Sequence, residues 1–273
     1  MSDRGRERLD QALVRQGLFS TRSAAAAAVI AGEVLVGGQP AHKPGQPVAE
    51  GTALEVVRRG PAYASRGGLK LAGALDAFAV DPGGRVCLDV GASTGGFTDC
   101  LLQRGATRVY AVDVGYGQLA WPLRTDPRVV VLERVNARYL TAAHVPEAVE
   151  LAVLDLAFIS LTKVLPAVVA RLRADGAVIA LVKPQFEAGR KQVGKGGIVR
   201  DPAVHRQVLL AVGSAAADLG WPFWGLVPSP ITGADGNREF LALARRGAPA
   251  PQLDRMVLEA VPGEAGERDA GGG

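Results

Sequence analysis

The sequence predicts an α/β protein in which a Rossmann-like domain with a mostly parallel sheet follows a small α+β module. From residue 85 onward, short apolar runs rich in β-branched residues alternate with helical segments. These runs are apolar throughout, which is typical of strands that are buried on both faces of a parallel sheet. Residues 7–58 instead combine two short helical patterns with Gly/Pro-rich turns.

The composition sets broad limits. The chain has 273 residues, 48% of them hydrophobic and 21% charged, which is enough for one large domain and one small one. The net charge of +4 is compatible with a polyanionic partner but does not establish one. Cys87 and Cys100 lack metal or redox spacing and the three histidines are scattered, so we expect buried cysteines and no metal site.

The first module, residues 1–58, should contain two helices. Leu9 and Leu13 recur at helical spacing in a segment that should end at Gly17. Ser20 or Thr21 can cap a second helix through the alanine run. Short β-prone runs follow at residues 35–38 and 53–57.

Five arginines concentrate positive charge on this module: Arg4, Arg6, Arg8, Arg15 and Arg22. Arginine pairs bidentately with phosphate and stacks on bases, which suits folded RNA. A solvated charged face is the alternative interpretation of such a cluster.

The remaining organisation follows from composition changes. We expect a linker at residues 59–64, the large domain at 65–247, and a partly disordered tail at 248–273. The first residues lack the apolar core of a secretory signal, and no apolar run is long enough to span a bilayer. These features predict a cytoplasmic location and no membrane partner.

Seven strands and several helices are expected in the large domain. A helix, or a loop followed by a helix, should span residues 65–78 and carry Lys70, and other helices should follow Gly96, Ser160 and Pro202. The strands are expected at residues 85–91, 108–114, 129–135, 151–158, 177–184, 223–227 and 239–244.

The stretch LDVGASTGGFTD at residues 88–99 predicts a strand that ends in a glycine-rich turn and opens a helix. Gly91, Gly95 and Gly96 allow close approach of the backbone to a ligand. Asp113, at the end of the next strand, can accept hydrogen bonds from a ribose diol. The pattern fits any adenosine ligand, but the spacing is not the dinucleotide fingerprint and favours S-adenosylmethionine over NAD. A tight turn without a ligand is the alternative.

Asp155 and Lys183 follow the fourth and fifth strands, so both are expected at the carboxyl edge of the sheet. Glu239 begins the last strand and reaches the same edge if that strand is antiparallel. Lys183 would then lie between two carboxylates. Such a lysine can stabilise or deprotonate a ribose 2′-hydroxyl during methylation. A solvated lysine at a strand end is the alternative.

Lys70, Asp155, Lys183 and Glu239 together resemble the K-D-K-E tetrad of the FtsJ-like 2′-O-methyltransferases. The stretches SRGGLKL, DVGASTGGFTD, DLAFISL, LVKPQFE and GKGGIVRD resemble the TlyA (hemolysin A) family, and residues 7–58 resemble an S4 RNA-binding domain. The resemblance implies an S4 domain, a linker and a seven-stranded class I methyltransferase domain. It also implies S-adenosylmethionine as cofactor and cytidine ribose in ribosomal RNA, free or in assembled subunits, as substrate. Lys70 is assigned to the site by this resemblance alone.

We assign two further sets of residues on this basis. Asn136, after the third strand, would reach the adenine, and Phe158 could pack beside the cofactor or belong to the core. The expected cofactor-binding residues are Asp89, Gly91, Ser93, Gly95, Gly96, Phe97, Asp113 and Asn136. The expected RNA-binding residues are Arg4, Arg6, Arg8 and Arg22.

Three other functions compete with this interpretation. The family's hemolysin name suggests a membrane-active protein, although no transmembrane, barrel or secretion pattern supports one. An NAD-dependent oxidoreductase is disfavoured by the glycine spacing. An RNA-binding protein without catalysis is disfavoured because all four tetrad positions are filled.

Overall fold

The structure is a computed structural model that describes residues 6–30, 32–57, 62–233, 235–247 and 252–262. The chain divides into two compact units, Met1–Ala62 and Tyr63–Gly273, which are described separately. Arg4, residues 59–61 of the predicted linker, and residues 248–251 and 263–273 of the predicted tail lie outside the described residues.

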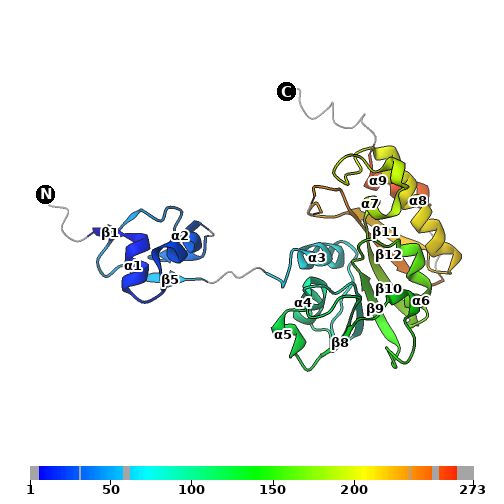
Figure 1. The fold of residues 1–273 in the computed structure, drawn as a ribbon, viewed down its shortest axis with the longest axis horizontal. Helices are drawn as coiled ribbons and strands as arrows, with labels where there is room; N and C mark the ends of the chain where they lie inside the picture. The colour runs from blue at the N-terminus through cyan, green and yellow to red at the C-terminus, as the bar shows by residue number, and fades with distance from the viewer. Residues whose placement is uncertain (1–5, 31, 58–61, 234, 248–251, 263–273) are drawn as a thin grey trace. The chain divides into compact units, whose positions relative to one another are not determined.

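The first unit contains the two predicted helices together with short strands (Figure 1). Its elements are β1 (Arg6–Arg8), α1 (Leu9–Arg15), α2 (Arg22–Ile30), β2 (Val34–Val36), β3 (Gln39–Pro40), β4 (Pro47–Ala49) and β5 (Leu54–Val56). β1 pairs antiparallel with β4, and β2 pairs with both β3 and β5. The Thr21 hydroxyl oxygen accepts a hydrogen bond from the amide of Ala24 at 3.2 Å, which confirms the predicted cap of α2. Leu9 and Leu13 are fully buried in this unit's own core.

The second unit is built on a seven-stranded sheet with the order β11-β12-β10-β9-β6-β7-β8. The strands are β6 (Val86–Val90), β7 (Arg108–Asp113), β8 (Val129–Glu133), β9 (Val149–Leu154), β10 (Leu172–Val182), β11 (Phe223–Pro228) and β12 (Phe240–Arg245). β12 runs antiparallel to both of its neighbours, whereas β6 to β10 pair in parallel. The predicted mostly parallel sheet is therefore confirmed.

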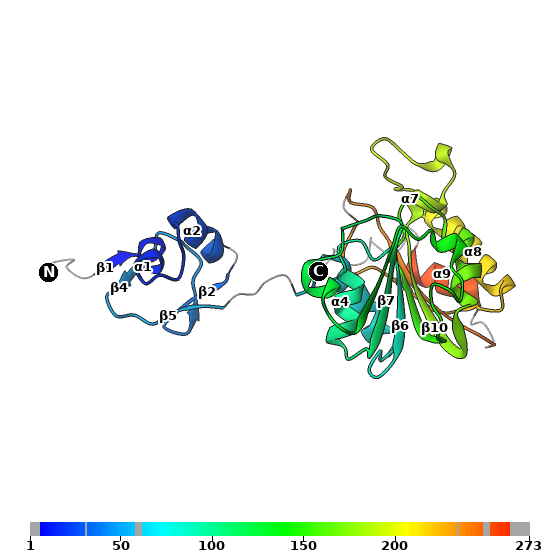
Figure 2. The ribbon, with the colours of Figure 1, turned by 60° about the horizontal axis from the view of Figure 1, so that its bottom comes forward.

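Helices cover both faces of this sheet, as Figures 1 and 2 show from two directions. Cys87 of β6 packs with α3 and α4 on one face, whereas Leu88 and Val90 pack with α6, α8 and α9 on the other. This explains why consecutive residues in the centres of these strands are apolar. The helices are α3 (Gly67–Ala77), α4 (Gly96–Gln103), α5 (Trp121–Arg124), α6 (Leu165–Val169), α7 (Pro184–Glu187), α8 (Pro202–Asp218) and α9 (Leu253–Ala260), with 3-10 turns η1 (Ala137–Tyr139), η2 (Leu161–Lys163) and η3 (Arg190–Gln192).

The structure departs from the sequence predictions at several element boundaries. The sequence predicts a strand that continues to residue 158. β9 ends at Leu154 instead, and residues 155–158 form the loop that follows it. β12 begins at Phe240, one residue after Glu239. Helix α9 lies where the sequence predicts a tail, and its Met256 and Val257 are buried against the second unit. The second unit therefore extends beyond residue 247.

Candidate active site

The predicted acidic and basic residues of the sheet lie at one edge. Asp113 is the last residue of β7, and Asp155 and Lys183 directly follow β9 and β10. Because β12 is antiparallel to β10, Glu239, just before β12, lies at this same edge. Carboxyl ends of parallel strands are the usual ligand-binding edge of such folds.

Two lysine–carboxylate pairs form at this edge. Lys183 Nζ lies 2.6 Å from Asp155 Oδ1, and Lys70 Nζ, from α3, lies 2.5 Å from Glu239 Oε2. The Lys70 and Glu239 side chains are only 11% and 3% exposed, so each charge depends on its partner. The structure thus brings Lys70 to the site, and each lysine is paired with one carboxylate. Lys183 does not bridge Asp155 and Glu239 as the sequence suggested.

The glycine loop between β6 and α4 is packed tightly against the rest of the protein. Gly91 has φ +87°, and a Cβ there would lie 2.4 Å from the carbonyl oxygen of Asp155. A Cβ at Gly96 would lie 2.2 Å from Ser65 Oγ, and Gly95, at φ +97°, begins α4 in a left-handed conformation. The protein's own packing therefore already requires these glycines, in addition to any ligand that approaches the loop.

Asp113 fixes the conformation of the loops around it. Its Oδ2 accepts a hydrogen bond from the Ser93 amide at 2.8 Å, and its Oδ1 accepts one from the Gly115 amide at 2.7 Å. Ser93 has φ +48°, an uncommon conformation for a residue other than glycine. The carboxylate therefore holds the glycine loop and the segment after β7 together.

Asp89 lies beneath the loop and does not line the cavities described below. Its side chain is fully buried, and its Oδ2 accepts a hydrogen bond from the Thr98 hydroxyl at 2.6 Å. Burial raises the pKa of Asp89 to about 7. Asp89 thus supports the start of α4 from inside the protein.

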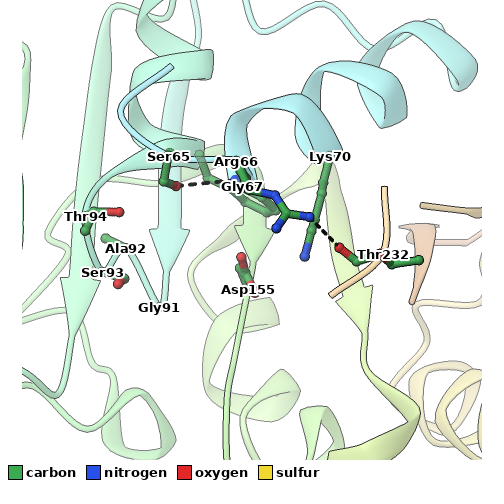
Figure 3. Close-up of a pocket in the computed structure, with 12 residues that line it drawn as sticks. Ser65, Arg66, Gly67, Lys70, Gly91, Ala92, Ser93, Thr94, Asp155 and Thr232 are labelled. Carbon is green, nitrogen blue, oxygen red and sulfur yellow. Dashed lines mark hydrogen bonds between the residues drawn. The ribbon is translucent and has the colours of Figure 1, made fainter. Parts of the chain in front are cut away.

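Two adjoining cavities open beside the glycine loop, and both are lined by Gly91, Ser93 and Asp155. The larger, of about 460 Å³, is also lined by Asp113, Asn136 and Phe158, with apolar walls from Val112, Val135, Leu156 and Ile159. The smaller, of about 190 Å³, is also lined by Ser65, Arg66, Gly67, Lys70, Gly96, Phe97 and Thr232. Figure 3 shows Lys70 and Asp155 pointing into the same space.

Residues that the sequence analysis did not identify close the smaller cavity. Arg66, which precedes α3, donates a hydrogen bond to the carbonyl oxygen of Thr232 at 3.1 Å (Figure 3). Ser65 Oγ accepts a hydrogen bond from the Gly67 amide at 3.3 Å. The Arg66 contact joins the start of α3 to the loop before β12, whereas the Ser65 contact lies within the start of α3. Both Ser65 and Arg66 lie in or beside the motif SRGGLKL, which was the available signal for them.

Glu187 is a second residue that the sequence analysis missed. Its carboxylate accepts hydrogen bonds from the Ser160 hydroxyl at 2.6 Å and from the Leu161 amide at 2.7 Å. Burial raises the pKa of Glu187. Glu187 thereby joins the segment after β10 to the loop that carries Phe158.

Phe158 is 90% exposed, with φ +64°, and its ring centroid lies 5.0 Å from that of Phe186. It is therefore not a core residue.

Two of the predicted RNA-binding arginines of the first unit share one acid. Arg8 and Arg22 both form ion pairs with Asp10, while Arg6 is exposed on β1. Arg4 lies outside the described residues.

Comparison with known proteins gives a consistent result for both units. The FtsJ-like methyltransferase model matches residues 63–246, and the S4 domain model matches residues 7–54. The chain is 53% identical over 94% of its length to the 16S/23S rRNA (cytidine-2′-O)-methyltransferase TlyA of Mycobacterium tuberculosis, and covers 97% of that protein. It is 40% identical over 86% of its length to Hemolysin A of Brachyspira hyodysenteriae, of which it covers 98%.

Solved structures agree with these matches. A Streptococcus thermophilus protein described as a hemolysin is 44% identical and superposes with a TM-score of 0.69. The match covers 94% of this chain and 96% of that protein. A Listeria monocytogenes protein described as an S-adenosylmethionine-dependent methyltransferase is 18% identical with a TM-score of 0.50, and 67% of this chain is covered. That likeness concerns the fold alone. By its two domain matches and its near full-length relatives, the chain belongs to the TlyA (hemolysin A) family of S4-domain, FtsJ-like methyltransferases.

Proposed function

We propose that this protein transfers a methyl group from S-adenosylmethionine to the 2′-hydroxyl of a cytidine ribose in ribosomal RNA. The observation that carries this proposal is the pair of lysine–carboxylate contacts, Lys70–Glu239 and Lys183–Asp155, beside a cavity of nucleoside size. The names of the relatives, which include a cytidine-2′-O-methyltransferase acting on 16S and 23S rRNA, support the same reaction.

The larger cavity fits the cofactor. Its volume of about 460 Å³ lies in the usual range for small-molecule sites. Asp113 offers carboxylate lone pairs to the ribose diol, and Asn136 offers a side-chain amide at the adenine end. Valine and leucine side chains give the apolar walls that a base requires. The smaller cavity would then receive the methyl-bearing end, between the glycine loop and Lys70.

The four charged residues supply the chemistry at the acceptor. When bound, S-adenosylmethionine provides an electrophilic methyl group. Asp155 lines both cavities, so we assign it to orient the 2′-hydroxyl toward that group. Lys183, paired with Asp155, either keeps its charge and stabilises the oxygen while the hydroxyl proton passes to solvent, or accepts that proton after losing its own. Glu239 holds Lys70 in the opposite wall of the smaller cavity. We propose that these residues act without a metal.

The RNA would be bound by both units. The S4 domain match and the arginines Arg6, Arg8 and Arg22 support RNA binding by the first unit. In the second unit, the exposed ring of Phe158 beside the cavity offers a face on which a base can stack. Because the relative from Mycobacterium tuberculosis is named for both 16S and 23S rRNA, we propose assembled or nascent ribosomal subunits in the cytoplasm as the substrate.

The hemolysin name of some relatives raises a different function. Across the residues that the structure describes, we find no helix that is both long and apolar enough to cross a membrane. No observation in the described part favours pore formation over methyl transfer. A dye-release assay with liposomes would detect membrane activity directly.

Transfer of tritium from labelled S-adenosylmethionine to separated small and large ribosomal subunits tests the proposal. We expect incorporation into ribose 2′-O-methylcytidine of one or both subunits, at a rate about a hundred- to a thousandfold lower with the variant Lys183→Ala. A chain of residues 62–273 should bind the cofactor but lose most RNA methylation, because it lacks the S4 domain. NAD binding without S-adenosylmethionine binding, or incorporation into base rather than ribose, would contradict the proposal.

A further inference from the structure

A buried acid organises the basic surface of the first unit. Asp10 in α1 is 4% exposed, between the fully buried Leu9 and Leu13 on the same helix. An isolated carboxylate in such a position would be strongly destabilising, so it needs charged partners. Its partners are two arginines that also reach solvent.

Both arginines contact the same carboxylate. Arg8 donates from Nε to Oδ1 and from Nη2 to Oδ2, each at 3.0 Å, in a bidentate arrangement. Arg22 donates from Nη2 to Oδ2 at 3.1 Å. The two Nη2 atoms thus share one oxygen and lie close together. The hydrogen bond from Arg8, with a smaller contribution from Arg22, lowers the pKa of Asp10 to about 2, so the acid is ionised at neutral pH.

The arrangement leaves both guanidinium groups accessible. The side chains of Arg8 and Arg22 are 51% and 56% exposed, against 5% for that of Asp10. Two positive charges stand over one buried negative charge, so a net positive charge faces solvent. On the far side of Arg8, a Cβ at Gly45 would lie 2.8 Å from Nη1, so Gly45 leaves the room that this guanidinium occupies.

We propose that Asp10 is a positioning residue that presents Arg8 and Arg22 as one preformed site for an RNA phosphate. The inference rests on the RNA-binding function proposed above. A flexible arginine loses rotamer freedom when it binds phosphate, and a side chain that is already fixed avoids that loss. A bound phosphate can accept hydrogen bonds from the donors that Asp10 does not use.

Charge alone and positioning predict opposite effects for one substitution. Asp10→Asn removes a negative charge beside the arginines, so long-range attraction to RNA should become stronger. If Asp10 positions the arginines, RNA binding should instead become weaker, although the surface is more positive. The first unit offers a matched control, because Glu7 forms a more exposed ion pair with Arg15 at 2.5 Å. Glu7→Gln makes the same change in net charge.

The experiment measures binding of the full chain to deproteinised bacterial ribosomal RNA across a series of salt concentrations. We expect Asp10→Asn to bind about two- to tenfold more weakly for each arginine released. Glu7→Gln should bind equally well or more tightly. Affinity for S-adenosylmethionine, a property of the second unit, should be unchanged in both variants.

Further variants keep the test decisive if Asp10→Asn unfolds the first unit. Arg8→Lys and Arg22→Lys keep the charge but lose the planar donors, so each should also weaken RNA binding. Asp10→Asn binding as tightly as Glu7→Gln would overturn the inference, as would unchanged affinity in both lysine variants. If the wild-type chain binds no RNA, the proposed function fails as well. If the wild-type chain binds RNA and the Asp10, Arg8 and Arg22 variants bind it equally well, the proposed function stands and Asp10 has no positioning role.

Discussion

Lys70 and Glu239 form an ion pair in which Nζ and Oε2 are 2.5 Å apart, although 169 positions separate them in the sequence. The contact joins α3, which precedes the sheet, to the start of β12, its last strand. The loop before β12 wraps closely around the carboxylate, since a Cβ at Gly233 would lie 2.6 Å from Glu239 Oε1. One wall of the smaller cavity therefore depends on this pair.

Removing one partner of this pair should destabilise the fold more than removing both. Lys70→Met leaves the Glu239 carboxylate buried without a counter-charge, which typically costs on the order of 3–5 kcal/mol of the free energy of unfolding. Lys70→Met combined with Glu239→Gln should recover part of that loss. Urea unfolding of the two single variants and the double variant measures the coupling. The exposed pair Arg255–Glu259 is the control, and strictly additive effects at positions 70 and 239 would contradict the expectation.

Gly96 should not tolerate a side chain. A Cβ there would lie 2.2 Å from Ser65 Oγ and 2.9 Å from the amide nitrogen of Gly68, so Gly96→Ala must push the start of α3 away from α4. We expect a loss of about 1–3 kcal/mol in stability, together with weaker cofactor binding. Gly189→Ala is a matched control, because its nearest atom would lie at 3.5 Å and its φ is −63°. Thermal unfolding and calorimetry on both variants check this, and a fully stable Gly96→Ala protein would contradict it.

Asp89 should make stability depend on pH in an unusual range. Burial raises the pKa of Asp89 from 3.8 to about 7, so the folded protein keeps a proton that the unfolded chain releases above about pH 4. The contribution of Asp89 to the free energy of unfolding therefore falls as pH rises from about 4 to about 7. Asp89→Asn has no carboxyl group to titrate and does not lose this contribution. The free energy of unfolding of the variant, relative to that of wild type, should therefore rise between about pH 4 and about pH 7. Urea unfolding at pH 4, 5.5, 7 and 8 tests the slope, and a constant difference between the two proteins would refute the assignment.

The parts of the fold that sequence could predict are those with a strong local pattern. The strands of the parallel sheet contain runs of consecutive apolar residues because both faces are buried, as with Cys87 and Leu88, so their existence was evident. The strands β1, β3 and β4 have two or three residues each and leave no such pattern. Helix α9 was missed because it lies between a proline-rich segment and a glycine-rich end. The composition of this region predicts a partly disordered tail.

The site was predictable as far as topology determines it. Asp155 and Lys183 follow parallel strands, so their meeting at one edge could be inferred from the sequence. The carboxylate with which each lysine pairs could not be inferred, because this pairing depends on how α3 packs over the sheet. That packing is a long-range property of the fold. Glu187 could not be found either, since its role arises from a loop contact with Ser160 that no residue spacing encodes.

Asp113 should be required for cofactor affinity. Asp113→Ala removes the acceptor for the ribose and also the hydrogen bonds to the Ser93 and Gly115 amides. Hydrogen bonds to a charged group are worth about 1.5–3 kcal/mol, so affinity for S-adenosylmethionine should fall by roughly 10- to 150-fold. Titration calorimetry measures this, with Asp175→Ala as an exposed acidic control. Unchanged affinity in Asp113→Ala would remove this residue from the cofactor site.

Lys183 provides the sharpest test of the mechanism, because a role in methyl transfer and a purely structural role in its pair with Asp155 predict different rates. If it stabilises the ribose oxygen or accepts its proton, Lys183→Ala should slow the chemical step by about a hundred- to a thousandfold, or on the order of 2.7–4 kcal/mol. Lys183→Arg should not restore the rate, since arginine keeps its proton and its planar group fits the space beside Asp155 differently. The exposed Lys163→Ala should behave like wild type.

Single-turnover methylation with saturating cofactor separates the chemical step from binding in these Lys183 variants. Affinity for S-adenosylmethionine should change little, because Lys183 contacts Asp155 and does not line the larger cavity. A loss of cofactor affinity as large as the loss of rate would indicate that Lys183 only maintains the shape of the site. A Lys183→Ala protein that methylates at the wild-type rate would mean that its pairing with Asp155 has no part in the reaction.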